Sequence, residues 1–180
     1  MTDKLKTKWI AVEPELFLAD ISTEAKKLAV YIRDNCGLYD PWDPEMEIFI
    51  PFKLNRKADK ICADLGFSRE QLELAVKDLR RFPTKSKRFL EGCNAKRDAY
   101  LCSPLRSGYI KVYRWLLESP LPWKVKEAVF VAKAGGQIKN AKVLEAVTRL
   151  GLIQEDGTVT DEGATFACLK FIAKLENTKA

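Results

Sequence analysis

The stretch Leu150-Gly-Leu-Ile-Gln-Glu-Asp-Gly-Thr-Val-Thr-Asp-Glu-Gly163 carries the clearest fold signal in this 180-residue chain. Its Leu-Gly-Leu-Ile start is typical of a helix end that leads into a short strand. Glu155-Asp156-Gly157 then suits a tight turn between two short strands. Thr160 is placed to cap a further helix, from Asp161 to about Leu175. The stretch therefore predicts a helix, a two-stranded wing and a closing helix.

Two helices are expected before this stretch, over residues 109–118 and 123–134, separated by Ser119-Pro-Leu-Pro122. Gly135-Gly136 supplies a turn, and a third helix follows over residues 138–150. Apolar residues recur along it at helical spacing, which predicts that its inward face holds Val143, Leu144, Val147 and Leu150.

A similar order of elements is predicted for the N-terminal half. Trp9–Val12 reads as extended, and Ser22 is placed to cap a helix that ends near Gly37. A β-like run, Glu47–Phe52, follows. Asn55 is then expected to cap the next helix.

The segment Leu65-Gly66-Phe67-Ser68 reads as a helix end, a turn and a new cap. Ser68 followed three residues later by Gln71 forms a capping box. The new helix must stop before Pro83. Two short helices joined by a glycine turn indicate a helix-turn-helix. Strands at 88–93 and 98–103, around 94–97, would make a basic wing.

The expected fold is therefore mainly α with small β wings (α+β), in two tandem winged-helix-like units. The boundary falls in the connection at residues 104–108. This places an N-terminal domain at 1–106, with a basic segment at 77–106, and a C-terminal domain at 107–180.

Composition argues against most enzyme chemistry. The chain has no histidine, which removes the commonest general base and metal ligand. It also lacks a phosphate-binding glycine loop. We therefore expect no enzymatic activity, no cofactor and no metal, although a carboxylate–metal site remains an open alternative without a motif.

The same survey predicts a cytoplasmic location. Five scattered cysteines without a CxxC pair indicate reduced thiols. No apolar run is long enough for a membrane span, and no secretory signal is expected.

Charge is concentrated in the middle of the chain. Residues 77–106 hold nine Lys/Arg and three Asp/Glu, a net charge of +6, which equals that of the whole chain. A basic segment attracts nucleic-acid phosphates. A solvated surface loop is the alternative interpretation.

Residues 9–82 resemble the N-terminal domains of phage and plasmid replication initiators of the replisome-organiser type. The residues that carry this resemblance are Trp9–Val12, Leu16-Phe17, Ser22–Val30 and Ala63–Ser68, leading into Leu79. Residues 123–175 resemble a winged helix of the transcription-repressor kind. The resemblance implies a fold and DNA binding. A long acidic insert at 39–47 departs from the replication-protein pattern.

The second helix of a helix-turn-helix places its first residues at base edges in the major groove. In the C-terminal unit these candidate DNA-binding residues are Gln137, Lys139, Asn140, Lys142 and, one face away, Arg149. An ordinary solvated helix face is the alternative.

The N-terminal candidates fall into two groups. On the helix they are Arg69, Gln71, Lys77, Arg80 and Arg81, where Glu70, Glu73 and Asp78 oppose phosphate. Past its end, Lys85, Lys87 and Arg88 suit phosphate contacts. Lys96 and Arg97 of the first wing suit a minor groove, or they belong to a mobile charged loop.

The second wing and the last helix are less basic. Glu155, Asp156, Asp161 and Glu162 make this wing a poor DNA contact. Phe166 and Leu169 lie off the main apolar face of the last helix. They predict either packing between the two halves or a homodimer interface, which would suit a palindromic site.

We therefore expect a double-stranded DNA-binding protein that acts in replication initiation or transcription control of a phage, plasmid or mobile element. The alternative is a winged-helix protein-interaction module or assembly scaffold. The acidic, aromatic loop at 39–47 favours this alternative, because it offers a site for a protein partner.

Overall fold

A computed structural model of the chain describes residues 9–35, 52–83, 89–94, 99–102, 108–154 and 159. It divides the chain into two units. The central unit comprises residues 19–108. The split unit comprises residues 1–18 and 109–180, and is therefore built from both ends of the chain.

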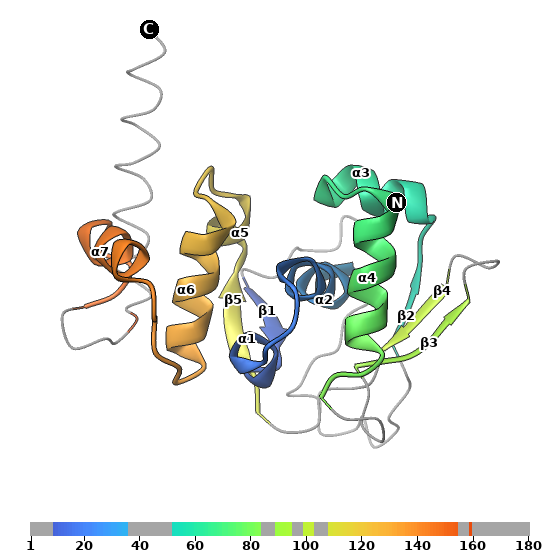
Figure 1. Ribbon diagram of the computed structural model, residues 1–180, viewed down its shortest axis with the longest axis horizontal. Coiled ribbons are helices and arrows are strands. Elements are labelled where there is room, and N and C mark those ends of the chain that lie inside the picture. The colour runs from blue at the N-terminus through green and yellow to red at the C-terminus, as the bar shows by residue number, and fades with distance from the viewer. Residues whose placement is uncertain are drawn as a thin grey trace, which may run out of the picture. The chain divides into compact units, whose positions relative to one another are not determined.

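The central unit has three helices and three strands in its described residues. In chain order they are α2 (Thr23–Asn35), β2 (Phe52–Asn55), α3 (Ala58–Leu65), α4 (Arg69–Leu79), β3 (Leu90–Asn94) and β4 (Ala99–Cys102). The strands form an antiparallel sheet in the order β2-β4-β3, so the strand between the first two helices pairs with the second strand of the hairpin (Figure 1).

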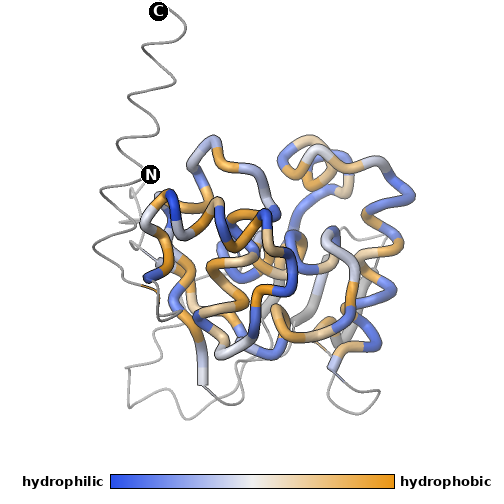
Figure 2. The backbone as a smooth tube through the Cα atoms, turned by 60° about the vertical axis from the view of Figure 1, so that its left-hand side comes forward, coloured by the Kyte–Doolittle hydropathy of each residue, from blue (hydrophilic) through white to orange (hydrophobic). Residues whose placement is uncertain are grey.

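Helix α2 begins where the sequence predicts. The Ala25 backbone N–H donates to Ser22 Oγ at 3.2 Å, which satisfies a donor of the first turn. Ala25, Leu28, Ala29 and Ile32 are fully buried, and α2 packs against α4. The alternation of hydrophobic and hydrophilic residues that this packing requires runs along the helices of both units (Figure 2).

The sheet of the central unit completes its core. Leu54 of β2 lies opposite Tyr100 of β4, and both side chains are buried. The Phe89 backbone N–H donates to the Phe82 carbonyl oxygen at 2.7 Å, which fixes the chain entering β3 to the chain leaving α4. Helix α4 and the hairpin are thereby held in one framework.

In the split unit, the described elements are β1 (Trp9–Val12), α1 (Glu15–Leu18), β5 (Ile110–Tyr113), α5 (Arg114–Glu118), α6 (Trp123–Lys133) and α7 (Ala141–Arg149). Strands β1 and β5 pair antiparallel, with Ile10 opposite Val112 (Figure 1). Phe17 of α1 meets Phe130 of α6 at a ring distance of 5.0 Å, and both rings are buried.

A buried lysine joins α5 to α6. Lys126 is 8% exposed, and its Nζ donates to the carbonyl oxygens of Leu117 and Ser119, the latter at 2.7 Å. These carbonyls lie at the end of α5, where a helix has no further backbone N–H groups to bond its last carbonyl oxygens. The ammonium therefore caps α5 from inside the unit.

The mixed α and β class is confirmed, and so are the helix cap at Ser22 and the two strands after α4. Residues 9–18, which were expected in the N-terminal domain, group with the C-terminal part of the chain, because β1 pairs with β5, about a hundred residues further on. The helix expected from residue 109 begins only at Arg114. The alternation Ile110-Lys-Val-Tyr113 places Val112 inward as a strand residue.

Two further expectations need correction. Asn55 does not cap α3: it ends β2, and the cap position falls to Lys57, which makes no side-chain cap bond. Helix α7 starts at Ala141 rather than 138, because Asn140 caps it. Leu144, expected to face inward, is 42% exposed, whereas Val147 is fully buried.

Candidate nucleic-acid interface

The turn between α3 and α4 fixes how α4 is presented. Gly66 has φ of 67°, a left-handed conformation that suits glycine, and the Phe67 N–H donates to the Cys62 carbonyl at 2.9 Å. The predicted capping box is confirmed. Ser68 Oγ accepts from the Gln71 N–H at 3.2 Å, and the Ser68 N–H donates to Gln71 Oε1 at 2.9 Å.

Helix α4 presents a mixed face to solvent. Its buried positions are Leu72, Ala75 and Leu79. The exposed face carries Glu70 and Glu73 in its first half, then Leu74, and Lys77 toward its end. Arg80, the C-cap residue, and Arg81, just past the helix, are exposed as well. Among the described residues, the three basic side chains have no ion-pair partner.

Two predicted DNA contacts on α4 already have partners. Arg69 pairs with Asp59 of α3 at 2.6 Å. Gln71 is held by the capping box, and its Nε2 donates to Glu24 Oε1 at 3.3 Å. Their geometry ties α4 to α3 and to α2, so both residues position the helix.

Asp78 was expected to oppose phosphate, but it faces the start of α2. Its Oδ2 accepts from Ser22 Oγ at 2.6 Å and from the Ser22 backbone N–H at 3.2 Å. A carboxylate is favourable there because the N-terminus of a helix is partly positive. The acids left on the exposed face of α4 are Glu70 and Glu73.

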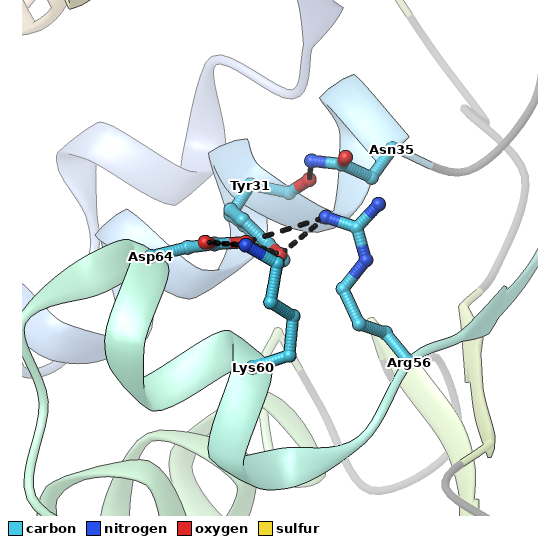
Figure 3. A network of polar contacts seen from close by, with 5 residues as sticks. All are labelled: Tyr31, Asn35, Arg56, Lys60 and Asp64. Atoms are coloured by element: carbon cyan, nitrogen blue, oxygen red, sulfur yellow. Dashed lines mark hydrogen bonds and ion pairs between the residues drawn. The ribbon is translucent and has the colours of Figure 1, made fainter.

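A polar network that sequence reasoning missed joins α2 to α3 (Figure 3). Arg56 Nη1 donates to Tyr31 Oη at 2.6 Å, and Tyr31 Oη donates to Asp64 Oδ2 at 2.7 Å. Lys60 Nζ reaches Asp64 Oδ1 at 2.6 Å, and Arg56 lies 3.4 Å from Asp64 Oδ2. Of these contacts, only the Lys60–Asp64 ion pair could be predicted from the sequence, because the two residues are four positions apart on one helix.

The network shifts the protonation of its members in opposite directions. Hydrogen bonds from Lys60 and then Tyr31 lower the pKa of Asp64. Partial burial, followed by the hydrogen bond to Asp64, raises the pKa of Tyr31. At neutral pH the carboxylate is therefore charged and the phenol neutral, which is the state that this bonding pattern requires.

The helix pair α6–α7 presents its candidates differently. Gln137, Lys139 and Asn140 lie in the connection before α7, and Lys142 and Arg149 lie at its two ends. All five are exposed. The Asn140 side chain accepts from the N–H groups of Lys142 and Val143 at 3.1 and 3.2 Å, so its carbonyl oxygen is used as the cap of α7.

The remaining candidates fall outside the described residues. These are Lys85, Lys87, Arg88, Lys96 and Arg97, the acidic second wing except Val159, Phe166 and Leu169 of the expected dimer interface, and the loop at 39–47. Expectations for them stay predictions. The two strands that were expected to form the first wing are observed as β3 and β4.

Within the described ranges, no three cysteine or acidic side chains come together as ligands for a metal ion. Over the same ranges, none of the helices has the length and apolar character that crossing a membrane requires. Comparison with protein-family models, with curated proteins and with solved structures found no match to this chain.

Proposed function

We propose that the central unit is a winged-helix unit that binds double-stranded DNA, with α4 as its recognition helix. The observation that carries the proposal is the arrangement around α4. A second helix, reached by a tight glycine turn, is followed directly by an antiparallel hairpin, and a strand from before the helix pair closes the sheet.

Charge supports the same assignment. Lys77, Arg80 and Arg81 are exposed at the end of α4, and the sequence continues into further basic residues. Three phosphate contacts predict that log K falls with log salt concentration with a slope of about −2.7. Such contacts hold a protein on the duplex without reading its sequence.

The role in replication initiation or transcription control of a phage, plasmid or mobile element is part of this proposal. It depends on the resemblance of residues 9–82. The split unit contributes a second helix pair, α6–α7, as a candidate winged helix. Because Lys142 and Arg149 lie at opposite ends of α7, we assign the main phosphate contacts to α4.

The test is binding of the full chain to a random-sequence duplex between about 50 and 200 mM salt, where multi-phosphate contacts lose much of their affinity. The double variant Arg80→Ala/Arg81→Ala should reduce the salt slope by about 2. Lys142→Ala/Arg149→Ala is the matched control, since it removes the same charge from α7.

A steep native slope that only the α4 variant reduces supports the proposal. Absence of binding at about 50 mM salt contradicts it, because multi-phosphate contacts are strong there. Equal loss in both variants would mean that net charge, and not α4, governs binding. Absence of binding would turn the search to protein partners of a winged-helix interaction module.

A further inference from the structure

Leu74 lies in the middle of the exposed face of α4. It is 57% exposed, the highest value among the exposed large hydrophobic side chains of the described residues. The buried face of the same helix is complete without it, since Leu72, Ala75 and Leu79 fill those positions. Core packing therefore does not explain a leucine at this place.

The neighbours of Leu74 on that face divide it into two chemical regions. Glu70 and Glu73 lie on its N-terminal side, and Lys77, Arg80 and Arg81 follow on its C-terminal side. Carboxylates repel phosphates, whereas the basic end attracts them. A duplex bound by the basic end would therefore meet the first half of α4 through base edges rather than through its backbone.

Base edges in the major groove offer one large apolar group, the 5-methyl group of thymine. We infer that Leu74 is a specificity-determining residue that selects thymine by contact with this methyl group. The inference rests on the proposed function, because it requires α4 to enter the major groove.

A protein partner fits this face less well. The cores of protein interfaces are depleted in charged residues, whereas Leu74 stands alone among five charged side chains within about three turns of α4. A groove lined by phosphates with methyl groups on its floor matches both the isolated leucine and the basic end.

The test starts from duplexes selected by the native chain from a random pool. The best duplex is then remade with each thymidine replaced in turn by deoxyuridine, which differs only by the missing methyl group. At one or two positions we expect affinity to fall about fourfold. This fold-change corresponds to the free energy gained by burying one methyl-sized group. Leu74→Ala should bind both duplexes alike, and Leu74→Met should keep the preference.

Leu144→Ala is the matched control, since Leu144 is an exposed leucine of α7, at 42%. It should leave unchanged the fourfold ratio between the affinities for the thymidine duplex and the deoxyuridine duplex. Because both leucines are exposed, neither substitution should alter thermal unfolding, which is measured on the same samples.

The outcomes separate the two proposals. Binding without any difference between thymidine and deoxyuridine overturns the inference and leaves the proposed function standing. A thymine preference that survives Leu74→Ala also overturns it, since another residue must then make the contact. Absence of duplex binding at low salt overturns both. Loss of a protein partner rather than of thymine preference in Leu74→Ala would assign the leucine to a protein interface.

Discussion

The helix pairs α3–α4 and α6–α7 have the same order of parts but different connections. Gly66–Ser68 joins α3 to α4 with a left-handed glycine, and the space around Gly66 is open. Residues 134–140 join α6 to α7, and Gly136 lies against Leu18 and Val131. Helix α4 buries three residues, whereas Val147 is the buried residue of α7.

This difference bears on the proposal that α4 is a recognition helix. A short turn and three buried residues hold α4 in one orientation. The side chains of its outer face therefore point in defined directions. The longer connection before α7 and its single buried residue constrain that helix less. Base reading needs fixed side-chain positions, which is why we place it on α4.

The largest expected effect tests how firmly each second helix is held. Leu79→Ala should lower the free energy of unfolding by about 2–5 kcal/mol, because it removes a fully buried side chain and leaves a cavity. Leu144→Ala should change it by less than about 0.5 kcal/mol, as an exposed substitution. Urea unfolding of both variants measures the difference, and similar losses would mean that Leu144 is packed as firmly as Leu79.

The next effect tests the two turns. Gly136→Ala places a Cβ 2.5 Å from Leu18 Cδ2 and 2.8 Å from Val131 Cγ1, and such overpacking costs about 1–3 kcal/mol. Adding Leu18→Ala should restore part of that loss. Gly66→Ala should cost about 1–2 kcal/mol through its left-handed backbone alone.

Leu18→Ala should not rescue Gly66→Ala, since a Cβ at Gly66 meets no atom within 4 Å. Thermal unfolding of the four variants provides the measurement. If Leu18→Ala improved both glycine variants equally, its effect would be general, and the close contact at Gly136 would not explain the cost.

The features predicted correctly from the sequence depend on local chemistry. The cap at Ser22, the Ser68–Gln71 box and the turn at Gly66 each involve residues within five positions of one another. Their hydrogen bonds form wherever the helix forms, so residue type and spacing are sufficient to predict them.

Several features that sequence reasoning missed depend on distant partners. Pairing of β1 with β5 joins residues about a hundred positions apart, and Asp78 reaches Ser22 across 56 positions. Tyr31 of α2 and Arg56 meet Asp64 of α3 only in the folded chain, where α2 and α3 both pack against α4. Residue type and spacing do not identify such partners, because tertiary packing selects them. Asp78 therefore looked like a surface acid opposing phosphate.

A smaller effect concerns the caps of the second helices. Ser68→Ala and Asn140→Ala should each cost about 1 kcal/mol. Because α4 buries three of its residues and α7 buries Val147, Asn140→Ala should speed amide hydrogen exchange along α7, whereas Ser68→Ala should affect mainly the first turn of α4. Exchange confined to the first turn in both variants would remove the contrast between the helices.

The smallest expected effect concerns the tie between α2 and α3. Asp64 has a lowered pKa in the folded chain, so its contribution to stability is present at neutral pH and is lost as pH falls through the folded value, below about 4. Asp64→Asn keeps the shape but removes the charge. It should therefore destabilise the protein at pH 7 by less than Ser68→Ala does, because the network lies at the surface. The difference in the free energy of unfolding between Asp64→Asn and the native chain should shrink on acidification. Unfolding measured between pH 7 and about pH 3 tests this. A difference that stayed constant with pH would mean that hydrogen-bond geometry, rather than the carboxylate charge, joins the two helices.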